Sequence, residues 1–325
     1  MAVRLRAGLF LALVLLTTHV RAQQSSKVYQ IGYLIVGSPA ESAKRVSALR
    51  AGLLEYGYVE GKNIAFVFRS AQSAERLPEL ASDLVRLKVD LIFAPSSTEV
   101  EAARQATRTI PIVFATHADP ERLGHVTSLA RPGGNSTGLS VVLTELVAKE
   151  LEIMTQALPH MKRIGVLLMS TAPSYRPASQ AVEATAQRLG LQIVMVPVQT
   201  PADLDGAFAM MVRERVNGFL AVATPLIRSQ RVTVAELSLK HRLPGMFGTS
   251  DNVEAGGLMS YGADMVDQTR RAATYIDKIL KGAKPNDLPV EQASKYELVI
   301  NLKTAKKLRI TIPPSVLLRA DQIIE

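Results

Sequence analysis

The stretch Ile31-Gly32-Tyr33-Leu34, followed by a polar loop and a helix-like segment, has a counterpart 133 residues later in Ile164-Gly165-Val166-Leu167. Two further apolar pairs recur in the same order, 127 and 133 residues apart: Val89–Ala94 with Val216–Ala221, and Ile110–Ala115 with Leu243–Gly248. A repeated order at a nearly constant separation indicates two similar halves. We therefore expect two lobes that face each other, with small ligands binding in the cleft between them.

Short apolar runs alternate with longer amphipathic segments in both halves, which is the pattern of parallel sheets covered by helices. The predicted strands are 28–36, 63–69, 89–94, 110–115, 137–141, 163–169, 191–196, 217–222, 244–248, 257–260 and 296–300. The predicted helices are 41–56, 75–87, 98–107, 120–130, 144–157, 175–189, 201–215, 229–241 and 264–281, with a short helix from Lys303. The predicted fold class is α/β, with two doubly wound parallel-sheet lobes.

The first residues have the pattern of a cleavable secretory signal peptide over 1–22. Arg4 and Arg6 precede an apolar segment of 12 residues, Ala7–Thr18, which is short for a membrane span. Val20-Arg21-Ala22 resembles a cleavage site, so we expect the mature chain to begin near Gln23. A membrane anchor is the alternative, but a polar Gln-Gln-Ser-Ser run follows.

The cysteine content and the net charge exclude several classes of chemistry for this protein. The chain of 325 residues has no cysteine, which excludes disulfides, thiol catalysis and a lipid-modified cysteine at the cleavage site. A soluble mature protein in a Gram-negative periplasm is expected. Removing the three signal arginines from 38 basic residues leaves 35 against 29 acidic ones, a net charge of +6. These charges are interspersed, and no basic stripe or motif for nucleic acid is visible.

Ligands of parallel sheets bind at the carboxyl ends of the strands, and the predicted loops there are rich in hydroxyl groups. They are Gly37–Pro39, Pro95–Thr98, Thr116–Asp119, Ser170–Tyr175, Thr224-Pro225 and Thr249–Asn252. The candidate ligand-binding residues are Ser38, Ser96, Ser97, Thr98, Thr116, Asp119, Tyr175, Pro225 and Asp251.

Several of these residues also have purely structural interpretations. Ser97 or Thr98 could cap a helix with Glu101, and Asp119 before Pro120 has the chemistry of a helix N-cap. A helix N-terminus in a cleft could equally offer its free N–H groups to a carboxylate. Asp251 could accept from a ligand ammonium or be a turn aspartate, and Tyr175 could contact a ligand or lie on the surface.

Catalytic, metal and cofactor sites are not indicated. His117 could be combined with Ser96, Ser97 and Asp119 into a hydrolytic set, but no Gly-x-Ser-x-Gly elbow supports it. The five histidines are scattered, without metal-ligand spacing. The glycine-rich run Arg131–Asn135 lacks the pattern of a phosphate or dinucleotide loop. We therefore expect a protein that is not an enzyme, with no cofactor and no metal.

Four parts of the sequence carry a resemblance to a known family: Ser128–Gly138, Gly257–Gly262, Ile279–Pro285, and the ending Ile300–Leu308 followed by Ile312–Ser315. Over essentially the whole mature chain the sequence resembles the ABC transporter substrate-binding protein family, whose relatives include tryptophan- and tyrosine-binding members. It departs from the usual pattern at His117, Glu121 and Arg309, where a small residue, an apolar residue and glycine are common.

The resemblance implies a type I periplasmic-binding-protein fold, with three crossings between the lobes. It implies lobe 1 over 23–141 plus 262–290 and lobe 2 over 142–261 plus 291–325. Ligand contacts would come from Ser96, Ser97, Thr98 and Thr116 in the first lobe, and from Tyr175, Pro225 and Asp251 in the second.

The expected function is that of a periplasmic, monomeric solute-binding component of an ABC importer. It would capture a small polar ligand by hinge closure, and an amino acid or related carboxylate is the first candidate for that ligand. Its partners would be that ligand and a permease in the inner membrane, with neither nucleic acid nor membrane insertion of the mature chain. The alternative is a periplasmic sensing module for a membrane receptor or kinase. A DNA-binding regulator is disfavoured by the export signal at the N-terminus.

Overall fold

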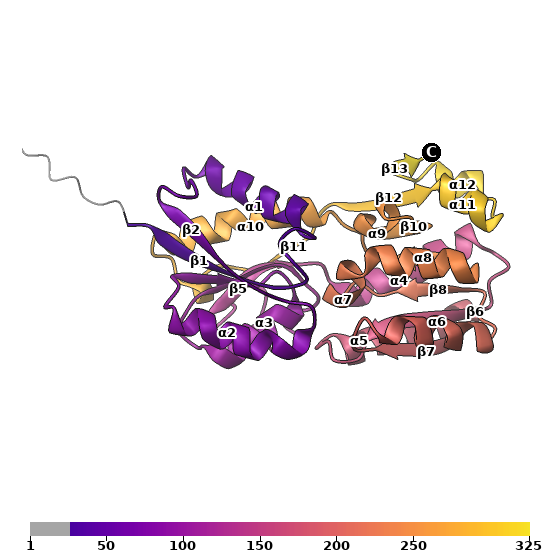
Figure 1. The fold of residues 1–325 in the computed structure, drawn as a ribbon, viewed down its shortest axis with the longest axis horizontal. Coiled ribbons are helices and arrows are strands. Elements are labelled where there is room, and N and C mark those ends of the chain that lie inside the picture. The colour runs from indigo at the N-terminus through magenta and orange to yellow at the C-terminus, as the bar shows by residue number, and fades with distance from the viewer. Residues whose placement is uncertain (1–26) are drawn as a thin grey trace, which may run out of the picture.

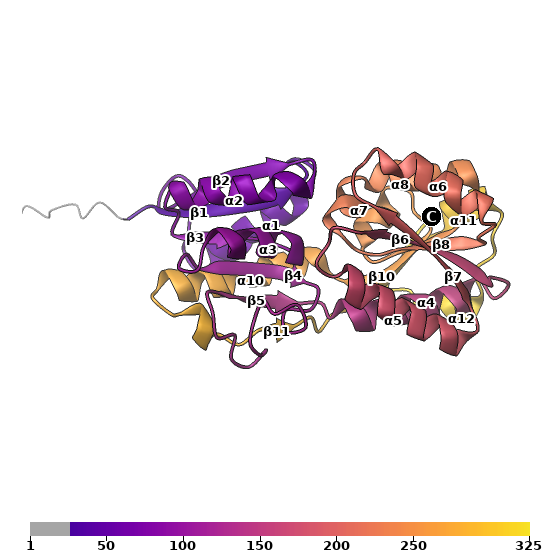
Figure 2. The same ribbon diagram turned by 90° about the horizontal axis from the view of Figure 1, so that it is seen from below.

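The computed structural model describes residues 27–325, so the predicted signal peptide lies outside the described residues. Two α/β lobes lie side by side along the long axis of the molecule (Figure 1). Each lobe has a sheet with helices on both faces (Figure 2), which confirms the predicted fold class.

The first lobe is built on a sheet of order β11-β5-β4-β3-β1-β2 in which every pair is parallel. Its strands are β1 (Tyr29–Val36), β2 (Ile64–Ala71), β3 (Leu91–Phe93), β4 (Ile112–His117), β5 (Ser136–Ser140) and β11 (Glu291–Gln292). Its helices are α1 (Ala43–Glu55), α2 (Leu77–Arg86), α3 (Ser97–Ala106) and α10 (Met265–Leu280), with the short 3₁₀ turns Ala74–Arg76 and Pro285–Asp287.

The second lobe has a sheet of order β13-β12-β10-β9-β8-β6-β7, parallel except for the β10–β12 pair. Its strands are β6 (Arg163–Met169), β7 (Gln192–Val198), β8 (Gly218–Ala221), β9 (Gly245–Phe247), β10 (Met259–Ala263), β12 (Tyr296–Asn301) and β13 (Gln322–Ile324). Its helices are α4 (Leu143–Ala157), α5 (Tyr175–Leu189), α6 (Asp203–Arg213), α7 (Pro225–Ser229), α8 (Arg231–His241), α9 (Ser250–Glu254), α11 (Leu302–Leu308) and α12 (Pro314–Leu317).

The two lobes repeat one topology, as the sequence pairs predicted. The order β2-β1-β3-β4-β5 of the first sheet corresponds to β7-β6-β8-β9-β10 of the second. Gly32 and Gly165 occupy equivalent places in β1 and β6. A Cβ at Gly165 would lie 2.6 Å from Met211 Sδ, and one at Gly32 would lie 3.0 Å from Leu84 Cδ1. Glycine therefore recurs because a helix packs closely on this strand in both lobes.

Each sheet has a buried core on both faces. In the first lobe, one apolar cluster includes Leu49 and Ile276 under α1 and α10, and another includes Leu84 and Val100 under α2 and α3. The second lobe likewise has one cluster beneath α4 and α5 and another beneath α6 and α8. Apolar residues at strand and helix spacing thus account for both three-layer lobes.

The chain passes between the lobes three times, after β5, after β10 and after β11. β11 pairs with β5 in the first sheet, so Glu291 and Gln292 lie beyond the expected boundary at residue 290. A long helix, α10, returns the chain to the first lobe, where it packs along α1 (Figure 1).

One predicted helix is wrong. Residues 120–130 form a turn over 120–124 followed by bends and irregular structure, rather than a helix. The amide of Leu123 donates to the carbonyl of Asp119 over 3.1 Å, but the turn stops at Gly124, whose φ is +67°. At Arg309, where relatives commonly have glycine, φ is +59° at the end of α11. That left-handed conformation explains the glycine preference.

Candidate functional site: a cleft between the two lobes

A cavity lies between the lobes at the carboxyl ends of both sheets. Its empty volume is about 650 Å³, part of it open to solvent. The first lobe contributes Ser96, Ser97, Thr98, Thr116 and Ala118, and α10 adds Met265. The linking segment, α4 and the second lobe contribute Val141, Leu143, Leu146, Ser174, Ala223, Thr224, Pro225, Ile227, Arg228, Gly248, Thr249 and Asn252.

The wall from the first lobe is formed where β3 ends and α3 begins. Ser96 precedes the helix and donates its hydroxyl hydrogen to Glu99, whose other carboxylate oxygen accepts from the amide of Val36 over 3.2 Å. Ser97 is the first helical residue and is buried. Thr116, near the end of β4, donates its hydroxyl to the carbonyl of Pro95 over 3.0 Å.

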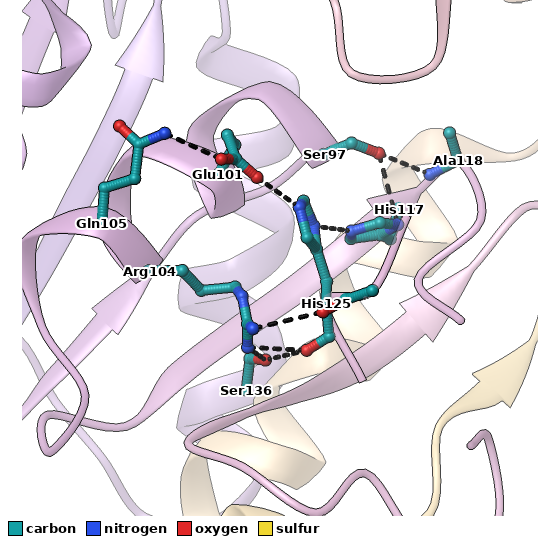
Figure 3. A network of polar contacts seen from close by, with 9 residues as sticks. Ser97, Glu101, Arg104, Gln105, His117, Ala118, His125 and Ser136 are labelled. Carbon is teal, nitrogen blue, oxygen red and sulfur yellow. Dashed lines mark hydrogen bonds and ion pairs between the residues drawn. The ribbon is translucent and has the colours of Figure 1, made fainter. Parts of the chain in front are cut away.

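A chain of hydrogen bonds runs from Ser97 through the first lobe to its surface (Figure 3). Ser97 Oγ lies 3.3 Å from His117 Nδ1, and His117 Nε2 lies 2.7 Å from His125 Nδ1. His125 Nε2 lies 2.6 Å from Glu101 Oε2. Both histidines are buried, whereas the Glu101 side chain is 42% exposed. The chain therefore links the cleft wall to solvent.

The protonation of this chain follows from its surroundings. Burial lowers the pKa of His117 well below its ordinary value, and His125 and Arg104 add to this effect. Burial also lowers the pKa of His125, against the raising effect of Glu101. Partial burial alone would raise the pKa of Glu101, but hydrogen bonds from His125 and Gln105 bring it below its ordinary value. Two neutral imidazoles and one carboxylate result at neutral pH.

The wall from the second lobe presents hydrogen-bond donors. Thr224 caps α7, its hydroxyl oxygen accepting from the amide of Ile227 over 3.4 Å, and Arg228 follows on this short helix. Arg228 is 8% exposed, and its Nη2 atom has no hydrogen-bond partner among residues 27–325. Asn252 in α9 is 2% exposed; its Oδ1 accepts from Thr249 over 2.7 Å, and its Nδ2 has no partner in the same part of the chain.

Positive charge gathers on one side of this cleft. Arg45 of α1 is buried, and its Nη2 donates to Ser42 over 3.2 Å. Burial and, to a smaller extent, the nearby Arg228 of the opposite lobe lower the pKa of Arg45 to about 10. Lys44 of α1 also pairs with Glu254 of α9 across the lobes. The two lobes are thus in contact beside the cavity.

Five of the nine predicted site residues line the cavity: Ser96, Ser97, Thr98, Thr116 and Pro225. The other four lie elsewhere. Ser38 bonds within its own loop, where its hydroxyl accepts from the amide of Glu41 over 3.2 Å. Asp119 accepts from the amide of Arg122 over 3.1 Å, so it closes a turn. Tyr175 packs against the core of the second lobe. Asp251 lines a separate recess together with Lys44, Arg45 and Glu254.

Five polar residues that line the cleft are not among the predicted site residues: Ser174, Thr224, Arg228, Thr249 and Asn252. All except Arg228 belong to predicted cleft loops, in which a neighbouring residue (Tyr175, Pro225 or Asp251) is the predicted contact. Arg228 follows the apolar Leu226-Ile227 on a helix that was not predicted. No local pattern distinguishes it from an arginine on the surface.

No group of three metal-ligating side chains occurs within residues 27–325. In the same part of the chain, none of the helices has the length and hydropathy needed to cross a bilayer.

Comparison with known proteins is consistent with this geometry. A structure of a conserved domain protein from Vibrio cholerae is 29% identical, with a TM-score of 0.84 over 92% of this chain and 99% of that one. The ABC domain of Streptococcus pneumoniae in complex with L-Trp is 28% identical, with a TM-score of 0.83 over 92% of this chain and 100% of that one. The tyrosine-binding protein of Clostridioides difficile (strain R20291) is 28% identical over 79% of this chain and 74% of its own length.

These similarities identify the fold as that of type I periplasmic binding proteins. The family model described as ABC transporter substrate binding protein matches residues 33–324, nearly the whole of the described chain. The chain therefore belongs to the ABC transporter substrate-binding protein family.

Proposed function

We propose that this protein is the periplasmic solute-binding component of an ABC importer, and that it captures a small aliphatic amino acid or a related carboxylate. It acts without catalysis, as a monomer, after export through an N-terminal signal peptide. A permease in the inner membrane then recognises the closed form. The relatives named for tyrosine and bound to L-Trp support an amino acid as the ligand class.

The main support for this proposal comes from two buried hydrogen-bond donors of residues that line the cleft. Arg228 Nη2 and Asn252 Nδ2 are buried and have no acceptor among the described residues. A buried polar group without a partner costs free energy, about 1–3 kcal/mol and more for a charged group. A ligand carboxylate between these donors relieves that cost, because guanidinium and amide donors match its two oxygens.

The rest of the lining favours an aliphatic ligand. Val141, Leu143, Leu146, Ile227 and Met265 contribute apolar surface. No Phe or Tyr occurs among the described residues that line this cavity. A ligand aromatic ring would therefore have no aromatic side chain to stack on, so tyrosine and tryptophan are not the first choices for this chain.

Ligand-driven closure follows from the division of the lining between lobes. Ser97 belongs to the first lobe, and Arg228 and Asn252 to the second. A ligand that touches all three makes its full set of contacts only when the lobes are close together. It therefore stabilises the closed form by its differential affinity for that form.

A thermal-shift screen of the chain from Gln23 onward tests this proposal. The probes are the twenty L-amino acids and short branched carboxylates, since ligands that bind the native state raise the melting temperature. Arg228→Met should weaken binding of an aliphatic hit by roughly ten- to a hundredfold, the value of a charged hydrogen bond. Arg176→Met, which removes an exposed arginine of α5, should leave it unchanged. Equal affinity of the wild type and Arg228→Met would refute the carboxylate site.

Two other functions predict different experimental results. In a sensing module the closed form would engage a receptor or kinase, which a pull-down with purified permease and receptor candidates would reveal. An enzyme is suggested by the contact of Ser97 with His117, which resembles the activation of a serine nucleophile. A fluorophosphonate probe would label an activated serine, and we expect no labelling of Ser97.

A further inference from the structure

The hydrogen-bond chain behind Ser97 has a definite number of hydrogens. Three contacts link Ser97, His117, His125 and Glu101. The serine hydroxyl and two neutral imidazoles bring three hydrogens, and the carboxylate brings none. Each contact therefore receives one hydrogen only if every donor points toward Glu101.

Glu101, at the surface end of the chain, determines the direction in which the hydrogen bonds run. When it is ionised, the Glu101 carboxylate accepts hydrogen bonds and donates none. One of its oxygens faces His125 Nε2, and the other accepts from Gln105 Nε2 over 2.8 Å. His125 must then donate from Nε2, which leaves its Nδ1 as an acceptor. His117 donates to that atom from Nε2, so His117 Nδ1 accepts the hydroxyl hydrogen of Ser97. Both imidazoles are held as the Nε2–H tautomer.

The Ser97 hydroxyl group therefore makes two hydrogen bonds within the first lobe, one as a donor and one as an acceptor. Its hydrogen is directed to His117, and its oxygen accepts from the amide of Ala118 over 2.8 Å. A hydroxyl oxygen has two lone pairs, so one remains for the cavity that Ser97 lines.

We propose that Ser97 faces the cleft as a hydrogen-bond acceptor, and that the site therefore selects a ligand with an N–H or O–H donor there, such as the α-ammonium of an amino acid. This inference rests on the proposed function. It makes the cleft two-sided: Arg228 and Asn252 supply donors from the second lobe, and Ser97 supplies an acceptor from the first. His117, His125 and Glu101 are positioning residues, which act through Ser97.

The direction of the chain is tested without any ligand. The His160→Gln/His241→Gln variant leaves His117 and His125 as the histidines of the chain from Gln23 onward. Its ¹⁵N–¹H correlation spectrum at pH 7.5 should show two Nε2–H tautomers. An Nδ1–H tautomer at either histidine would overturn the proposal. Lysine has three donors and no acceptor, so adding Glu101→Lys should convert both rings to Nδ1–H.

The consequence for selectivity is tested with L-leucine and 4-methylpentanoate, which differ by the α-ammonium alone. In the wild type, L-leucine should bind at least roughly tenfold more tightly. Ser97→Ala and Glu101→Lys should remove that preference, whereas Glu236→Lys, at an exposed site on α8, should keep it. A preference that survives Ser97→Ala would overturn the proposal. If neither probe binds the wild type, the proposed ligand class fails, while the tautomers still decide the direction of the chain.

Discussion

The buried side chain of Glu150 makes the stability of this protein depend on pH in a way that can be measured. The residue lies on α4 and is 0% exposed, and neither of its carboxylate oxygens has a hydrogen-bond partner within the part of the chain that the structure describes. It sits behind the cavity wall, where a Cβ added to Gly248 would lie 3.1 Å from its Oε1. Burial raises the pKa of Glu150 from 4.5 to about 8. The side chain is therefore mainly protonated at neutral pH.

The magnitude follows from linkage between protonation and folding. The folded state holds this proton more tightly than the unfolded state, so its stabilising effect is fully present below pH 4.5 and is lost as pH rises through 8. One pKa unit corresponds to about 1.4 kcal/mol. Between pH 5 and pH 8, Glu150 should therefore lower the free energy of unfolding by about 3 to 4 kcal/mol.

The perturbation is Glu150→Gln, which keeps the size and removes the ionisable group. Urea unfolding at pH 5 and pH 8, followed by circular dichroism, measures the difference between the variant and the wild type. The variant should gain about 3 to 4 kcal/mol relative to the wild type at the higher pH. Glu183→Gln, an exposed position on α5, should show no such gain. If Glu150→Gln and the wild type change in parallel from pH 5 to pH 8, the reasoning is refuted.

Two further predictions concern the backbone and the histidine pair. Gly138→Ala should lower the melting temperature strongly, because φ is +147° and the added Cβ would lie 1.9 Å from the carbonyl oxygen of Phe114. The control is Gly206→Ala in α6, where an added Cβ would have no described atom within 4 Å. This second variant should raise the free energy of unfolding by about 0.5–1 kcal/mol. Since the folded-state pKa of buried His117 is lowered, its contribution to stability should be lost as pH falls below about 6.5, by up to about 1.4 kcal/mol per pH unit. The stability difference between the wild type and His117→Gln, measured from pH 7 to pH 5, should shrink accordingly; a constant difference would contradict the assignment.

Local patterns were sufficient for most of the secondary structure. The alternating apolar and amphipathic segments predicted β6 and α5 with the bounds that the structure has, Arg163–Met169 and Tyr175–Leu189. They failed for residues 120–130, where apolar spacing suggested a helix and Gly124 adopts a left-handed conformation that ends the first turn. The short helices α7 and α9, of five residues each, were not predicted because such lengths carry little periodicity.

The sequence by itself determined that this protein has two similar α/β lobes and which loops lie at the carboxyl ends of their strands, because repeated apolar spacing marks where strands and helices lie along the chain. Only the tertiary structure decided which side chains of those loops meet. Arg228 is buried because the opposite lobe approaches it, and His117, His125 and Glu101 form one chain because β4, the following turns and α3 pack together. Such contacts depend on how distant segments approach one another, and no local spacing encodes that approach.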